Sequence, residues 1–373
     1  MATFSWQDVL EVFSDETGLE LEEITDDDDF TTLGINQLLA PSILARLRGP
    51  NGEPVQSNLF TRYITVGALR RYYEQNQNQS SFRASDTSKP QKTTSPSMPL
   101  SIVFQNNPST SKHTVFLLPD GSGFGMAYAN LPPVDPSVCV VGMNSPYLRS
   151  ASQFSCSIEE LVLDWVREIY RRQPRGPYIL GGWSAGGYYS FEVAKRLHKD
   201  GHRVQKLILI DSPCRTVFES LPMEVVNYLA SRNLMGNWGT EKPPDWLVQH
   251  FDATLRAVAA YHPKPIDKHA EMETYIIWSR EGVQSPGTLK GSGLDLNVKV
   301  SRFLLEGKSN FGPNGWDQLV PSKEIVIGST SGTHFTMINP PHVNEMSVLI
   351  RDAVVGISNG RQSQWHRYLN PHV

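Results

Sequence analysis

At 373 residues the chain is long enough for one large domain and a small one. The formal net charge of −4 argues against a nucleic-acid-binding surface. No apolar run approaches the roughly 20 residues of a membrane span, and residues 1–7 lack the features of a secretion signal. Cys139, Cys156 and Cys214 show no metal-ligand spacing and cannot all pair. We therefore expect a cytoplasmic protein with reduced thiols, no metal and no cofactor.

Residues 1–75 are predicted to form a small all-α bundle. A first amphipathic helix carries apolar residues at helical spacing, namely Trp6, Val9, Leu10 and Phe13. A second helix has Ile43, Leu44 and Leu47 on its apolar face, and a last helix is expected over 66–73. The acidic run 26–29 predicts a solvated loop rather than a metal site, because no turn residues separate its carboxylates.

This module resembles an acyl carrier protein of fungal polyketide synthases, from Glu16-Thr17-Gly18 through Leu33-Gly34-Ile35 to Leu59-Phe60-Thr61. Carrier proteins read Gly-x-Asp-Ser-Leu, and the serine receives the phosphopantetheine arm. The chain instead reads Gly34-Ile35-Asn36-Gln37-Leu38, so Gln37 replaces that serine and offers no hydroxyl. Ser42 lies further along and does not match the motif. The resemblance thus implies a carrier-like module that cannot carry, with a structural or docking role or no remaining role.

A Gln-, Ser- and Pro-rich segment at 76–99 predicts a flexible linker. From residue 100 to 373, strand-like runs alternate with helical segments, which predicts an α/β fold with a mostly parallel sheet. The expected strands are Ser101–Phe104, Val115–Leu118, Val138–Gly142, Tyr178–Leu180, Leu207–Ile210, Tyr275–Trp278 and Glu324–Ile327. Helices are expected over 158–170 and 343–357. Residues 218–262 interrupt the alternation and predict a helical lid or an extra packed subdomain.

A Gly-x-Ser-x-Gly turn at Gly182, Ser184 and Gly186 joins an expected strand to a helix expected over 188–197. That context is the nucleophile-elbow pattern of α/β-hydrolases, in which the strained turn needs small neighbours. The alternative is a Gly-rich packing turn. We interpret Ser184 as the nucleophile.

A serine nucleophile needs a base that is held by an acid. His334 fits as the base, because it lies between the last expected strand and the closing helix. His262, His342, His366 and His372 are the weaker rivals. For the acid there are two candidates: Asp211 follows the strand after the elbow, and Glu281 follows the next one. We choose Asp211 because it ends a rigid strand, whereas Glu281 lies in a Gly-containing loop.

Acyl transfer also needs backbone N–H groups that stabilise the oxyanion. Ala185, directly after the serine, is one expected donor. The second is expected from the Gly-rich loop 117–125, with Ser122 first and Gly121 next. A phosphate-binding loop is disfavoured, since no lysine follows in the Walker pattern.

Four segments together resemble the terminal thioesterase domain of fungal non-reducing polyketide synthases: 119–123, 182–187, 209–213 and 311–317. The resemblance implies a serine that takes an acyl chain from a carrier-bound thioester, and it favours Asp211 as the acid. We therefore expect a thioesterase that acts in trans on a polyketide synthase carrier domain and releases the chain by hydrolysis. The alternatives are a Claisen or lactone-forming cyclase, a non-catalytic docking protein for a synthase, and a general carboxylesterase.

Overall fold

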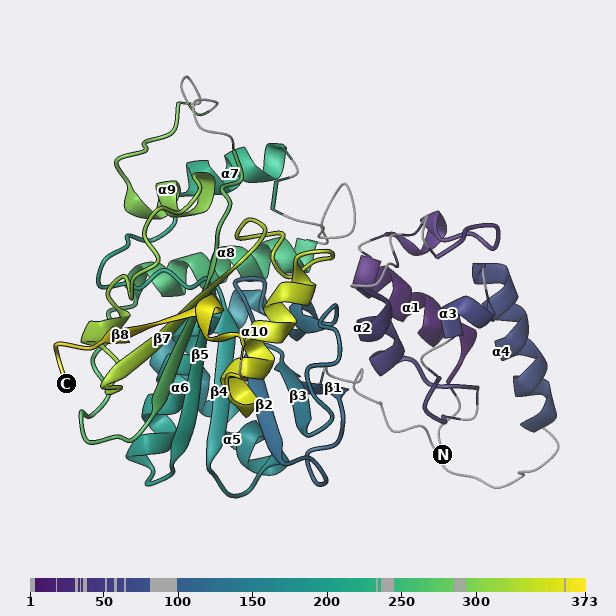
Figure 1. Ribbon diagram of the computed structural model, residues 1–373. Coiled ribbons are helices and arrows are strands. Elements are labelled where there is room, and N and C mark those ends of the chain that lie inside the picture. Colours follow the sequence, from purple (N-terminus) through teal and green to yellow (C-terminus); the bar gives the residue numbers. More distant parts are fainter. Residues whose placement is uncertain are drawn as a thin grey trace. The chain divides into compact units, whose positions relative to one another are not determined.

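The computed structural model divides into two compact units, one of Met1–Pro99 with Asn237–Val248 and one of Leu100–Gly236 with Gln249–Val373. We call residues 4–80 the helical module and the second unit the sheet domain (Figure 1). The structure describes residues 4–17, 19–30, 33, 35, 39–50, 52–56, 59–63, 65–80, 99–232, 234–235, 245–284, 289, 293–358 and 360–373. Gly34, Asn36 and Gln37 of the carrier-like motif lie outside these residues.

The helical module packs short helices around one apolar core. Its helices are α1 (Trp6–Thr17), the 3₁₀ turn η1 (Leu21–Glu23), α2 (Leu39–Arg46), α3 (Leu59–Arg62) and α4 (Val66–Ser80). The core consists of Val9, Val12, Phe13, Ile24, Phe30, Leu33, Ile35, Ile43, Leu47, Leu59, Val66, Leu69 and Tyr73. The three predicted helices correspond to α1, α2 and α4. Because α4 continues to Ser80, residues 76–80 of the predicted linker are helical.

A buried polar cluster crosses this core between α1 and α2. The Glu16 carboxylate is fully buried and accepts a hydrogen bond from Ser42 Oγ at 2.8 Å. The Arg46 guanidinium donates to Glu16 at 2.8 Å and to Asp15 at 2.6 Å. A buried charge is tolerated only when it is paired and hydrogen-bonded, as it is at Glu16. The Ser42 hydroxyl is therefore sealed inside the module.

The acidic run is a solvated turn with local partners. Asp28 accepts hydrogen bonds from the N–H and the hydroxyl of Thr25, and Asp26 lies 3.4 Å from Arg70. Among the described residues, no group of three or more His, Cys, Asp or Glu side chains could hold a metal ion.

The sheet domain is built on one sheet of order β1-β3-β2-β4-β5-β6-β7-β8 within the described part of the chain. The strands are β1 (Ser101–Gln105), β2 (His113–Leu118), β3 (Val138–Met143), β4 (Tyr178–Trp183), β5 (Val204–Ile210), β6 (Glu273–Ser279), β7 (Glu324–Thr330) and β8 (Trp365–Leu369). The six inner strands pair in parallel, and β1 and β8 pair antiparallel at the edges. All seven predicted strands are present, and β8 was not predicted.

Helices cover both faces of the sheet (Figure 1). One face carries α5 (Ile158–Arg172) and α6 (Ala185–Lys199), and the other carries α10 (Val343–Val355). The start of α5 is fixed by a capping box in which Ser157 and Glu160 satisfy each other's backbone N–H groups. The closing helix was predicted to reach residue 357, but it ends at Val355, before Gly356 at a φ of 124°.

Further helices lie in the segments that follow β5 and β6. They are α7 (Met223–Ser231) and α8 (Asp245–Ala260), within the predicted insertion, and α9 (Lys299–Leu305), which was not predicted. Short 3₁₀ turns lie at η2 (Gly125–Tyr128), η3 (Ala151–Gln153), η4 (Trp316–Gln318) and η5 (Gln362–Gln364). The described helices include none that is long and apolar enough to span a membrane. All three cysteines are unpaired, and Cys139 and Cys214 are buried.

Candidate active site

Ser184 lies in a sharp turn between β4 and α6. Its φ of 57° and ψ of −121° are strained for a residue with a side chain. A Cβ on Gly182 would lie 2.1 Å from the carbonyl oxygen of Gly186, and one on Gly186 would lie 2.5 Å from that of Leu118. The two glycines of the motif are therefore required by close backbone packing. The Ser184 side chain is only partly buried, so a substrate can reach its hydroxyl.

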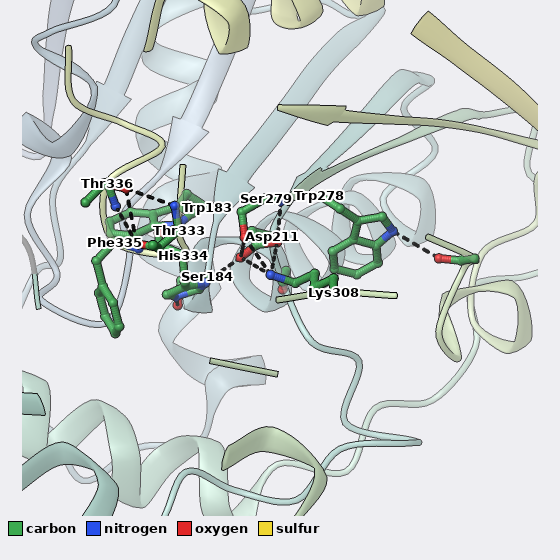
Figure 2. A network of polar contacts seen from close by, with 12 residues as sticks. Trp183, Ser184, Asp211, Trp278, Ser279, Lys308, Thr333, His334, Phe335 and Thr336 are labelled. Carbon is green, nitrogen blue, oxygen red and sulfur yellow. Dashed lines mark hydrogen bonds and ion pairs between the residues drawn. The ribbon is translucent and has the colours of Figure 1, made fainter. Parts of the chain in front are cut away.

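The structure brings Ser184, His334 and Asp211 together in one hydrogen-bonded chain (Figure 2). His334 Nε2 lies 3.0 Å from Ser184 Oγ, and His334 Nδ1 lies 2.7 Å from Asp211 Oδ2. The three residues come from separate places in the sequence: the turn after β4, the loop after β7 and the end of β5. This geometry can remove the proton of the serine hydroxyl as the oxygen attacks.

Asp211 follows β5 directly and is held rigidly. Its backbone has a φ of 45°, and its N–H donates to the carbonyl of Ile277 at 2.8 Å. Its carboxylate accepts hydrogen bonds from the N–H and the hydroxyl of Ser279, at 2.8 and 2.9 Å. Lys308 Nζ lies 3.0 Å from Oδ1 and 3.1 Å from Oδ2.

The electrostatics of the site keep Asp211 ionised. Burial raises the pKa of Asp211, but the charge of Lys308 and the hydrogen bond from His334 outweigh burial and lower it to about 2. With an ionised carboxylate at Nδ1, the neutral imidazole carries its proton on Nδ1 and accepts at Nε2. Burial lowers the pKa of His334; Asp211 raises it and Lys308 lowers it, with a net lowering. His334 is therefore neutral and able to act as a base near pH 7.

Aromatic side chains fix the His334 loop. The Trp183 indole N–H donates to the carbonyl of His334 at 3.0 Å, and the two ring centroids lie 5.4 Å apart. Phe335 packs edge-on to the imidazole at 4.9 Å, and Phe303 of α9 lies at 6.1 Å. Thr333 and Thr336 bond to each other and to the loop backbone, as Figure 2 shows. The imidazole is thus held on several sides.

The rival residues lie outside the hydrogen-bonded chain of Ser184, His334 and Asp211. Glu281, the alternative acid, accepts the backbone N–H of Gly332 at 2.7 Å, so it braces the histidine loop. His262 and His366 are exposed. His342 Nδ1 lies 3.0 Å from Ser331 Oγ, and His372 Nε2 lies 3.6 Å from Asp317.

The loop 119–125 contains the two residues predicted as oxyanion donors. The hydroxyl of Ser122 donates a hydrogen bond to the carboxylate of Asp120 at 2.5 Å. Burial raises the pKa of Asp120 to about 6, although the hydrogen bond from the Ser122 hydroxyl opposes the rise. Ala185 is the first residue of α6, where backbone N–H groups and the helix dipole favour an anion.

Helix α8 packs onto this loop. A Cβ on Gly121 would lie 2.8 Å from the Phe251 ring, and one on Gly123 would lie 2.2 Å from the His250 ring. The loop glycines therefore admit the helix. His250 Nδ1 lies 3.3 Å from the carbonyl of Gly121, and His250 is 1% exposed.

Two buried groups at the site were not predicted: Lys308, which touches Asp211, and His250, which touches the loop of Gly121. Neither belongs to a motif with fixed spacing. The sequence does place Lys308 just before the segment 311–317, which resembles part of a thioesterase domain. That segment is bonded to residues next in sequence to the acid and to its partner Ser279. The Trp278 indole N–H donates to the carbonyl of Gly312, and the Trp316 indole N–H donates to the carbonyl of Ser212.

Comparison with known proteins identifies the family to which each part of the chain is similar. The family model described as "Thioesterase domain" matches residues 113–347, and "Phosphopantetheine attachment site" matches residues 7–73. "Non-reducing polyketide synthase terA" of Aspergillus terreus is 34% identical over 93% of this chain and 18% of its own. "Non-reducing polyketide synthase PKS1" of Zymoseptoria tritici is 32% identical over 92% of this chain and 16% of its own. The chain thus spans less than a fifth of the length of these relatives.

Among solved structures, a four-domain nonribosomal peptide synthetase matches with a TM-score of 0.54 and 19% identity, over 94% of this chain and 26% of its own. That likeness supports the fold. The predicted α/β-hydrolase fold, preceded by a carrier-type helical module, is confirmed. The chain belongs to the thioesterase-domain family, as a serine-hydrolase type of thioesterase whose relatives are fungal non-reducing polyketide synthases.

Proposed function

We propose that this protein takes a polyketide acyl chain from the phosphopantetheine thioester of a carrier domain onto Ser184 and releases it by hydrolysis. The observation that carries this proposal is the hydrogen-bonded chain of Ser184, His334 and Asp211 in a thioesterase-family domain. Ser184 is the nucleophile, His334 the general base and then acid, and Asp211 the residue that orients the imidazole and stabilises its protonated form.

In the first half-reaction Ser184 Oγ attacks the thioester carbonyl carbon while its proton moves to His334 Nε2. The carbonyl oxygen becomes an oxyanion, which needs two N–H donors. We assign the Ala185 N–H as one donor. For the second donor we propose the Ser122 N–H of the loop 119–125, with Gly121 as the alternative. The C–S bond then breaks, and His334 returns the proton to the departing pantetheine thiolate.

In the second half-reaction water replaces the thiol. His334 Nε2 takes one proton of the water, the resulting hydroxide attacks the ester carbonyl, and the proton returns to Ser184 Oγ as the C–O bond breaks. The products are a free carboxylic acid and regenerated serine. We favour hydrolysis over cyclising release because water needs only His334 for activation, whereas cyclisation needs an acyl chain folded back on itself.

The acyl donor is a carrier domain other than residues 7–73 of this chain. Attachment of the arm forms a phosphodiester on a serine hydroxyl, and Gln37 stands at that position of the motif. Ser42 cannot substitute, because its hydroxyl is fully buried and bonded to Glu16. The partner we propose is therefore a separate polyketide synthase carrier domain that presents the loaded arm in trans.

The test incubates the protein with an acyl-loaded carrier domain and with an acyl N-acetylcysteamine thioester, and identifies the products by mass spectrometry. We expect the free acid from wild type and none above background from Ser184→Ala. A fluorophosphonate should label wild type and leave Ser184→Ala unlabelled. A matched oxygen ester is expected to react more slowly than the thioester.

Three results would count against the proposal in different ways. A cyclic product would overturn hydrolysis and leave acyl transfer to Ser184 in place. Faster turnover of the oxygen ester would point to a general carboxylesterase. If neither substrate reacted and the fluorophosphonate did not label Ser184, acyl transfer itself would be refuted, and a docking role would be the better account.

A further inference from the structure

A buried lysine lies behind the acid of the triad. Lys308 follows α9, and its side chain is 5% exposed. Its ammonium lies 3.0 Å from Oδ1 and 3.1 Å from Oδ2 of Asp211, and it donates to Ser279 Oγ at 2.5 Å. The Phe303 ring covers it at 4.1 Å. The groups that contact Lys308 all lie at the active site, and Figure 2 shows Asp211 and Ser279 among them.

Burial of an ammonium is unfavourable unless the lysine is well paired. Asp211 does not need this partner to satisfy its hydrogen bonds, because Ser279 supplies two donors and His334 a third. Lys206 offers a contrast in the same domain. It is also buried, but it donates to the carbonyls of Ala353 and Val354 at the end of α10, where a cation stabilises the helix terminus. Lys206 therefore has a structural explanation, whereas Lys308 bears on the acid.

We propose that Lys308 is a positioning residue that acts through Asp211. Its ammonium contacts both carboxylate oxygens of Asp211 and thereby opposes protonation of the His334 imidazole. The proposal rests on the function proposed above for Ser184, His334 and Asp211. A lone carboxylate beside the imidazole would stabilise the imidazolium strongly. With the ammonium in place the Asp211–Lys308 pair is neutral overall, so the imidazolium gains less from it.

The consequence is a triad that remains active at lower pH. Protonation of His334 blocks its role as a base, and Lys308 opposes that protonation. The direction agrees with the pKa of His334, which burial and Lys308 lower against the pull of Asp211. Lys308 thereby exchanges some strength of the base for a larger neutral fraction below pH 7.

The charged groups on neighbouring elements do not reproduce this effect. On the loop after β6, Arg280 pairs with Glu345 at 3.0 Å, and Glu281 accepts the Gly332 N–H. Arg302 and Glu306 line the same surface hollow of ≈ 330 Å³ as Lys308. The described charged groups that act on the pKa of His334 are Asp211 and Lys308.

The test compares Lys308→Met, which keeps the apolar stem and removes the charge, with Lys308→Arg and with Lys206→Met as the control for losing a buried lysine. Two rates are measured from pH 5 to 9: kcat/KM on a thioester mimic, and fluorophosphonate labelling of Ser184. For Lys308→Met we expect the acid limb of both profiles to move up by about one pH unit. On that limb this is about a tenfold loss of rate. Lys308→Arg should keep the limb near its wild-type position, and Lys206→Met should not move it.

An unchanged acid limb in Lys308→Met would overturn the proposal, as would an equal shift in Lys206→Met. If Lys308→Met does not fold, as judged by thermal unfolding, the His334 ring is titrated by NMR in the intact Ser184→Ala protein. A pKa of His334 above its ordinary 6.5 would then overturn it. The labelling arm needs no natural substrate. A shifted labelling profile without thioester turnover would therefore refute the proposed function and leave the role of Lys308 standing.

Discussion

The helical module and the sheet domain each bury a carboxylate beside a serine hydroxyl and a cation. In the module, Glu16 accepts from Ser42 and Arg46. In the sheet domain, Asp211 accepts from Ser279 and Lys308. The chemistry of the two clusters is nearly the same, and only the second includes a histidine that leads to a reachable hydroxyl. We infer that a buried charged cluster by itself contributes only to packing. It supports catalysis when it is connected, as Asp211 is through His334, to an accessible nucleophile.

The largest effect is expected when the two serines are compared directly. Ser184→Ala should lower kcat/KM on a thioester by on the order of 10⁶-fold, because no nucleophile remains. Ser42→Ala should leave kcat/KM unchanged and should destabilise the module by about 1–3 kcal/mol, since its buried hydrogen bond to Glu16 is lost. Turnover assays and denaturant unfolding check the pair. Equal losses of activity would contradict the contrast between the clusters.

The next effect separates the two carboxylates. Asp211→Asn should lower kcat by on the order of 10⁴-fold, because the amide no longer orients the Nδ1–H tautomer of His334. Glu16→Gln is the matched change in the module, and it should lower stability without lowering kcat. The measurement is kcat at saturating thioester, with circular dichroism to show that both variants fold. A full rate in Asp211→Asn would favour Glu281 as the acid.

A smaller effect is expected from pH on the packing of α8. Burial lowers the pKa of His250 to about 4, although its hydrogen bond with Gly121 raises it. The folded state thus favours the neutral ring. Its stability is full above the ordinary pKa of 6.5 and falls as pH drops towards 4, by roughly 3 kcal/mol over that window.

Unfolding curves at pH 7 and pH 4 for wild type and His250→Phe test this expectation. The variant lacks the titrating ring, so it should lose less stability between the two values. Parallel losses in the two proteins would show that His250 does not contribute to the pH dependence.

The smallest effect on turnover is expected at the carrier-like motif, where a double substitution should instead make the module able to accept phosphopantetheine. Changing Asn36 and Gln37 together to Asp and Ser restores the motif that accepts the arm. After treatment with coenzyme A and a phosphopantetheinyl transferase, the variant should gain the mass of one phosphopantetheine group, whereas wild type should not. Its rate on a free thioester mimic should stay at the wild-type value. A modified wild-type protein would contradict the trans donor that we propose.

The sequence allowed much of the fold to be predicted, because most inner strands are apolar runs and the long helices are periodic. Strand β8 was not predicted, because it is an edge strand whose His366, Arg367 and Leu369 are exposed. Its buried Trp365 alone does not produce the alternating apolar pattern of a strand. The residues of the Ser184–His334–Asp211 chain could be named because each follows a strand, and the ends of parallel strands meet at one edge.

The rest of the site depends on tertiary packing that no local pattern encodes. Lys308 is a charged residue in a loop, and such residues usually face solvent. It turns inward because Asp211, Ser279 and Phe303 make a place for its ammonium. His250 lies in an amphipathic segment whose sequence does not show what its apolar face contacts. The structure shows that this helix packs against loop 119–125, where a Cβ on Gly123 would meet the His250 ring.

The contact between Trp183 and His334 also gives the enzyme an optical signal. The indole lies next to the imidazole and donates to its carbonyl, so a proton gained by His334 places a cation beside an aromatic ring. Fluorescence from Trp183 should therefore change as His334 titrates. Subtracting the emission of Trp183→Phe would isolate that signal from the other seven tryptophans of the eight in the chain. The protonation state of the base could then be followed by light in the intact protein, without any added dye.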